Sequence, residues 1–132
     1  QGGLIGRINK LMSKKMILTI GSILMMLSLA MIPYAGTFLG LAIVSIVLSY
    51  GTGTFQPTVL SLISEVTSET EQGITLGINQ SLSSFARVLG PLWGGFAFEY
   101  LGYPFPFITG AIFTFIIFLL TVFYLPKKIK LE

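Results

Sequence analysis

The chain has 132 residues, of which 53% are hydrophobic and 10% are charged, and its formal net charge is +3. A soluble domain carries about 25% charged residues, so this composition is typical of a membrane protein. The sequence contains no cysteine, histidine or aspartate. Disulfides, thiolate or imidazole metal sites and Cys- or His-dependent catalysis therefore cannot be built from this chain. We expect no enzyme activity, catalytic residue, cofactor or metal.

Four apolar runs predict an all-α integral membrane protein with four transmembrane helices. Each run reaches or approaches the roughly 20 residues that a helix needs to cross about 30 Å of hydrocarbon. The expected organisation is a cytoplasmic loop over 1–15, transmembrane helices over 16–34, 37–64, 68–101 and 104–125, and a cytoplasmic tail over 126–132. Ser68 and Glu71 have the spacing of a capping box, which predicts that the third helix begins near Ser68.

Basic residues cluster outside the first and last spans. They are Arg7, Lys10, Lys14 and Lys15 before the first span, and Lys127, Lys128 and Lys130 after the last. The positive-inside rule then predicts that both termini are cytoplasmic and that the protein lies in the inner or plasma membrane of the cell. The basic tail is expected to anchor at anionic headgroups, and no nucleic-acid partner is expected.

The polar side chains are concentrated in the second and third spans. The first and fourth spans carry only Ser or Thr as polar side chains and are expected to present broad surfaces to lipid. The second and third are expected to face the protein interior. Candidate residues for a substrate cavity there are Arg87, Gln56, Tyr50, Asn79 and Gln80. Hydrogen bonding between helices is an alternative explanation for the four uncharged members.

Arg87 is the charged residue near the middle of the third span. An arginine at this depth costs about 2.5 to 3.5 kcal/mol on insertion scales, so something must offset its charge. One hypothesis is that Arg87 binds an anionic substrate group or a carboxylate elsewhere in the protein. The alternative is a hydrogen bond to a polar neighbour or to backbone carbonyls that Pro91 leaves without a donor.

The third span also carries a motif of small residues and proline. Its members are Gly77, Ala86, Gly90, Pro91, Gly94 and Gly95. Small residues three and four positions apart let helices pack closely in a membrane. The motif resembles the antiporter motif G-x8-G-x3-G-P-x2-G-G of the major facilitator superfamily, with Ala86 in place of the second glycine.

Two further segments resemble the drug and proton antiporters of that superfamily. Residues 2–10 are similar to its cytoplasmic loop signature G-x-x-x-D-R-x-G-R, with Gly6 in place of the acid. Residues 51–65 are similar to the tenth of its twelve helices. Because Gly6 replaces the acid and residues 38–63 carry no charge, the resemblance implies the C-terminal half, with transmembrane helices nine to twelve, rather than helices two to six.

The resemblance implies a function and several residue roles. It implies proton-coupled efflux of drug-like or amphipathic small molecules by alternating access, with an N-terminal half completing the cavity and carrying the proton-binding carboxylate, since Glu99 lies at the predicted outer end. It also implies a conformational lock between Arg7 and Glu65, for which solvated charges are the alternative. The small-residue motif would be a bend and sliding surface, or simply a packing face.

Two other functions remain open. A uniporter or symporter for a metabolite, from the same superfamily, has the same expected helices. A four-helix membrane scaffold or assembly protein would need no cavity, and oligomer packing would then account for Arg87 and the glycines.

Overall fold

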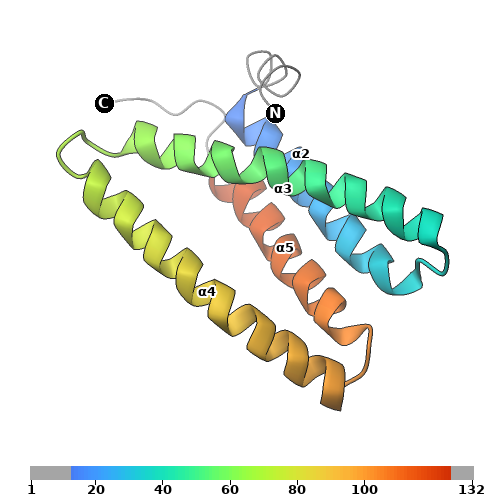
Figure 1. The fold of residues 1–132 in the computed structure, drawn as a ribbon. Coiled ribbons are helices and arrows are strands. Elements are labelled where there is room, and N and C mark those ends of the chain that lie inside the picture. Colours follow the sequence, from blue (N-terminus) through green and yellow to red (C-terminus); the bar gives the residue numbers. More distant parts are fainter. Residues whose placement is uncertain (1–12, 126–132) are drawn as a thin grey trace.

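The computed structural model describes residues 13–125, and within them the fold is all-α, as predicted. Its elements are α2 (Lys14–Met31), the short 3₁₀ helix η1 (Ile32–Tyr34), α3 (Phe38–Val66), α4 (Gln72–Tyr100) and α5 (Phe105–Tyr124), drawn in Figure 1. The expected loop signature and the basic tail residues 127, 128 and 130 lie outside the described residues.

Side-chain hydroxyls begin the first two long helices. Ser13 Oγ accepts a hydrogen bond from the backbone N–H of Met16, and Thr37 Oγ1 accepts one from Gly40. These bonds satisfy N–H groups that have no partner within the helix. Polar residues just outside the apolar runs therefore set where α2 and α3 start.

The turn between α3 and α4 differs from the expected capping box. α4 begins at Gln72, and its N-cap residue Glu71 makes no side-chain capping bond. The carbonyl of Ser68 accepts the N–H groups of both Glu71 and Gln72 at 3.0 Å, which forms a turn rather than the start of a helix. The Gln72 side chain then donates to the carbonyl of Ser64 at 2.9 Å, so it covers the end of α3.

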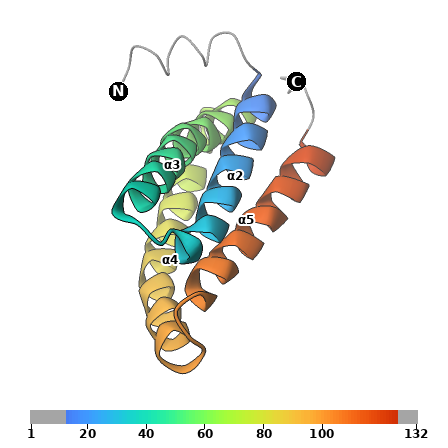
Figure 2. The ribbon, with the colours of Figure 1, turned by 90° about the vertical axis from the view of Figure 1, so that its right-hand side faces the viewer.

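Helix α2 packs between α3 and α5 (Figure 2). At the α2–α3 crossing, a Cβ added to Gly51 would lie 3.0 Å from the Gly21 carbonyl oxygen and 2.9 Å from Met25 Cγ. On the other side of α2, a Cβ added to Gly110 of α5 would lie 3.3 Å from Leu29 Cδ1. Small residues thus let the three helices approach closely, as is common in membranes.

Two lysines tie the N-terminal end of α2 to both neighbours. Lys14 forms an ion pair with Glu65 of α3, and its Nζ also donates to Ser61 Oγ at 2.7 Å. Lys15 Nζ donates to the Val122 carbonyl, near the C-terminus of α5, at 3.0 Å. A cation at this position is favourable because the helix dipole leaves negative partial charge there.

Among the described residues α2 is more buried than α3 and α5, while its expected contact with lipid stays a prediction. In its most apolar 18-residue window 28% of the residues are buried, against 11% in α3 and 17% in α5. Gly21, Ser22 and Ser28 are buried along it, and their small size allows contact on two sides.

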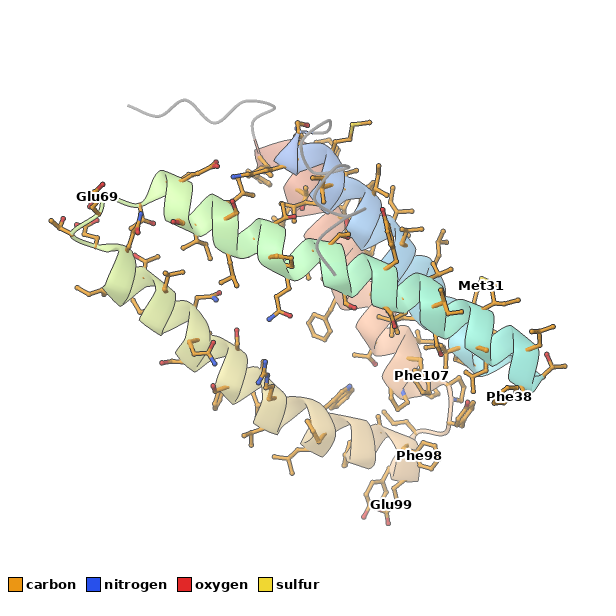
Figure 3. The ribbon with its side chains drawn as sticks, turned by 45° about the horizontal axis from the view of Figure 1, so that its top comes forward. Met31, Phe38, Glu69, Phe98, Glu99 and Phe107 are labelled. Carbon is orange, nitrogen blue, oxygen red and sulfur yellow. The ribbon has the colours of Figure 1, made fainter. Side chains whose placement is uncertain are left out.

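Helix α4 stands apart from this three-helix unit. Ala97 is its buried residue, and α4 meets its neighbours mainly near its two ends, marked by Glu69 and Glu99 in Figure 3. At the Glu99 end, Tyr103 contacts Phe98 of α4 and Phe107 of α5, with ring centroids 5.9 and 5.7 Å apart. Aromatic contacts and a tight turn with Gly102 at φ 110° therefore hold α4 near α5.

Among the described residues, three helices are both long and apolar enough to cross a bilayer: Lys14–Tyr34, Phe38–Val66 and Phe105–Tyr124. α4 has 29 residues, a length of about 43 Å, which also exceeds the roughly 30 Å hydrocarbon thickness. It is less apolar because it carries Asn79, Gln80 and Arg87. Polar residues in a spanning helix usually face protein or a cavity.

Replacement of Gly51 by leucine tests the α2–α3 contact. The new side chain would collide with the Gly21 carbonyl, and overpacking of this kind costs about 1 to 3 kcal/mol. Gly53→Leu is the matched control, because no atom lies within 4 Å of a Cβ added there. We expect the melting temperature of the full-length protein, followed by circular dichroism in detergent, to fall clearly more for Gly51→Leu. Equal shifts would contradict the proposed contact.

Candidate functional site

A hollow of about 270 Å³ lies between α3 and α4, beside α2. Its polar lining comes from Thr52 and Gln56 of α3 and from Asn79 and Ser83 of α4. In each pair the residues are four positions apart, so one face of each helix carries them. The apolar lining is Met25, Phe55, Val59 and Leu60. We call this hollow the polar pocket. Figure 3 shows side chains of α3 and α4 in the space between the two helices.

Three of the four polar side chains in this pocket have no hydrogen-bond partner among residues 13–125. Thr52 Oγ1 donates to the Leu48 carbonyl of its own helix at 3.1 Å. Gln56, Asn79 and Ser83 make no side-chain hydrogen bond to any other residue within 13–125. Two amides and a hydroxyl offer both donors and acceptors, so the polar pocket can hold a neutral polar group of a ligand.

The structure brings together only part of the predicted cavity set. Gln56 and Asn79 both line the polar pocket, whereas Tyr50, Gln80 and Arg87 do not. Thr52 and Ser83 were missed as candidates, although their four-residue spacing from Gln56 and Asn79 was a readable signal.

A second hollow, of about 730 Å³, lies between α4 and α5. α4 contributes Ala86, Leu89, Gly90, Trp93 and Gly94. α5 contributes Pro106, Phe107, Thr109, Gly110 and Phe113. Figure 3 labels Phe107 on α5. We call this hollow the apolar crevice, since its lining is mostly aliphatic and aromatic carbon.

The small-residue motif of α4 has no packing partner in the described part of the chain. A Cβ added to Gly77, Gly90, Gly94 or Gly95 would meet no atom within 4 Å there. Ala86, Gly90 and Gly94 instead line the apolar crevice. The close helix packing expected of this motif, Pro91 included, therefore needs a partner from beyond these residues, and its role stays a prediction.

Arg87 lines neither hollow, although nearby residues of α4, Ser83 and Ala86, line the polar pocket and the apolar crevice. Its side chain is exposed and makes no hydrogen bond or ion pair with any residue between 13 and 125. The alternative was a hydrogen bond from the Arg87 guanidinium to backbone carbonyls near Pro91. No such hydrogen bond is present among residues 13–125. The insertion cost of about 2.5 to 3.5 kcal/mol for a central arginine is not offset by any of these residues.

Glu65 has a partner that the sequence did not suggest. The expected partner, Arg7, lies outside the described residues, and in the structure Glu65 pairs with Lys14. The two side chains are 31% (Lys14) and 44% (Glu65) exposed, so the pair is expected to contribute about 0 to 1 kcal/mol. This interaction joins the adjacent ends of α2 and α3.

The described residues of these sites offer groups for binding a ligand. Across residues 13–125 no group of three or more His, Cys, Asp and Glu side chains is placed to hold a metal ion. The carboxylates in this range, Glu65, Glu69, Glu71 and Glu99, all lie at or near helix ends. The two hollows offer hydrogen bonds, apolar contact and, at Arg87, one positive charge.

Comparison with known proteins gives a consistent result. The family model for the Major Facilitator Superfamily matches residues 2–131. The uncharacterized MFS-type transporter YwoD of Bacillus subtilis (strain 168) is 30% identical over 125 residues, which cover 95% of this chain. The chain spans 27% of the length of that relative. No solved structure matches the chain.

A double-mutant cycle tests the contact between Lys14 and Glu65. The single changes Lys14→Gln and Glu65→Gln and the double change are compared by thermal unfolding of the full-length protein. We expect a coupling energy of about 0.2 to 1 kcal/mol, typical of an exposed pair. The same cycle with Glu69, an exposed acid of the α3–α4 turn, is the control and should give none. A cycle between Arg7 and Glu65 tests the pair expected from the sequence.

Proposed function

Because the chain belongs to the major facilitator superfamily, we propose that it forms part of a transporter that exports drug-like or amphipathic small molecules in exchange for protons. The observation that carries this proposal is the polar pocket between α3 and α4. Three of its side chains, Gln56, Asn79 and Ser83, have hydrogen-bonding capacity that no residue in 13–125 uses. Unused polar groups facing a hollow are what a binding site for small molecules requires.

The position and lining of the pocket support transport of amphipathic molecules. Thr52 is the middle residue of the 29-residue α3, and transporters of repeat architecture bind substrate near the bilayer midplane. Amide and hydroxyl groups face Met25 and Phe55 in the same hollow. A ligand with both hydrogen-bonding and apolar parts would use the whole lining.

We assign α2, α3, α4 and α5 to helices nine to twelve of a twelve-helix transporter, with both termini cytoplasmic. The exposed surface of α4 supports this assignment, because a helix that carries Arg87 and Asn79 is costly to leave in lipid. The remaining helices would cover that surface and complete the cavity. The proton-carrying carboxylate would lie on them, since the acids within 13–125 stand at or near helix ends.

Proton-coupled export can be measured in everted membrane vesicles that contain the full-length protein. Vesicles are acidified by respiration, and the pH gradient is followed with a quenched acridine dye. We expect ethidium or taurocholate, as cationic and anionic amphiphiles, to collapse part of the gradient only when the protein is present. Uptake of a compound without proton movement would favour a uniporter, and no response to any amphiphile or metabolite tested would favour the scaffold.

Alanine substitutions in the polar pocket test whether it holds the transported molecule. Asn79→Ala and Ser83→Ala each remove one neutral hydrogen bond, which is worth about 0.5 to 1.5 kcal/mol and corresponds to a two- to tenfold rise in the half-saturating substrate concentration. Ser81→Ala is the matched control, because Ser81 donates to the Gly77 carbonyl and does not line the pocket. An equal effect of all three changes would contradict a binding role for the pocket.

A further inference from the structure

We propose that the molecule bound by this protein is an amphipathic anion, whose acidic head binds Arg87 while its apolar tail lies in the crevice between α4 and α5. This inference rests on the proposed transport function, since head and tail are those of the transported molecule. It narrows the substrate class from amphipathic compounds in general to those with one negative charge near an apolar tail.

Arg87 lies on α4 close to residues of both hollows. It follows Ser83 of the polar pocket by four residues and precedes Gly90 of the apolar crevice by three. Residues three and four apart lie on one face of a helix. Arg87 therefore shares a helix face with Ser83 of the polar pocket and Gly90 of the crevice, although it lines neither hollow itself, and Ala86, one residue before it, already lines the crevice.

Arg87 has no acidic counter-charge among residues 13–125. Glu99 lies 12 residues beyond Arg87 and Glu71 lies 16 before it, separations of about 18 and 24 Å along a helix. Glu69 lies two residues further away, in the turn before α4. Glu65 is paired with Lys14. No acid within residues 13–125 is thus placed to neutralise Arg87, and an anion must come from a ligand or from another part of the protein.

The apolar crevice between α4 and α5 favours a ligand that has an apolar tail. Its volume of about 730 Å³ lies within the range of about 300 to 1,000 Å³ typical of ligand pockets. Trp93, Phe107 and Phe113 supply aromatic walls. The hydroxyl of Thr109 donates to the Phe105 carbonyl of its own helix, so it offers no donor to a polar ligand. An apolar chain fits this lining better than a second polar group.

The depth of Arg87 distinguishes such a ligand from a bilayer lipid. Arg87 is residue 16 of the 29 in α4, so it lies about 20 Å along the axis from either end of the helix. Phospholipid headgroups stay outside a hydrocarbon core about 30 Å thick. The anion at Arg87 is therefore a molecule drawn into the protein rather than the headgroup of a lipid in either leaflet.

Fluorescence quenching of Trp93 tests the proposal directly. Trp93 is the single tryptophan of this chain and lines the crevice, so the full-length protein is prepared with any other tryptophans replaced by phenylalanine. It is titrated in nanodiscs with dibromostearate, whose bromines quench a nearby indole, and with the uncharged methyl ester of the same acid. We expect saturable quenching by the acid at a concentration at least about tenfold lower than by the ester, because a hydrogen bond to a charged group adds that much affinity.

Variants of Arg87 and Gly94 test separately how the acidic head and the apolar tail of the ligand contribute to binding. Arg87→Gln should weaken binding of the acid about tenfold and leave the ester unchanged, while Arg87→Lys, which keeps the charge, should retain part of the difference. Gly94→Leu fills the crevice and should reduce quenching by both ligands. Gly77→Leu is its matched control, because Gly77 is equally open on α4 but does not line the crevice. Circular dichroism confirms that each variant is folded.

The possible results are distinct. Equal affinity for acid and ester, or an unchanged affinity in Arg87→Gln, would overturn the proposal. So would brominated phosphatidylglycerol quenching with the same dependence on Arg87, since the occupant would then be a membrane lipid. Arg87-dependent binding of the acid without its transport would overturn the proposed function and leave the binding site standing. Transport of ethidium without binding of the acid would overturn the proposed anion site and leave the proposed transport function standing.

Discussion

The close contact of α2 with α3 and α5 is the constraint on which the rest of this structure depends. In lipid there is little hydrophobic drive between helices, so close packing and a few polar contacts must hold them together. Gly21 and Gly51 supply the closest approach, and Lys14 and Lys15 fix the adjoining helix ends. The surfaces of α3 and α5 that face α2 are used by this packing, and α4 does not pack along the length of either helix (Figure 3).

The separate position of α4 creates both hollows. α4 is joined to α3 through a turn at residues 67–71 and to α5 through the aromatic cluster around Tyr103. Its middle stands clear, with the polar pocket towards α3 and the apolar crevice towards α5. A helix that packed along its whole length would have filled these spaces with its own side chains.

The sequence was sufficient for features that depend on a single helix. Four apolar runs gave the all-α membrane fold, and the polarity of Gln56 and Asn79 marked the helix faces that meet in the polar pocket. Features that depend on how two helices cross were not predictable in the same way. The partner of Glu65 and the burial of α2 are set by crossing geometry, which periodicity along one helix does not contain. One feature of a single helix, the start of α4, was also predicted wrongly, because Ser68 bonds through its carbonyl rather than as a side-chain cap.

Arg87 connects this architecture to a mechanism. A ligand shifts a conformational equilibrium only by its difference in affinity between the two states, and under the proposal above this difference would come from the contact between Arg87 and the anion. Within residues 13–125 no acid is placed to neutralise Arg87, and α4 approaches its neighbours mainly near its two ends (Figure 3). If movement of α4 towards its neighbours brings Arg87, the polar pocket and the crevice around one molecule, the binding energy of that molecule would favour the closed state. Arg87, the residue that is most costly to place in the membrane, would then couple the binding of the ligand to the conformation of the protein.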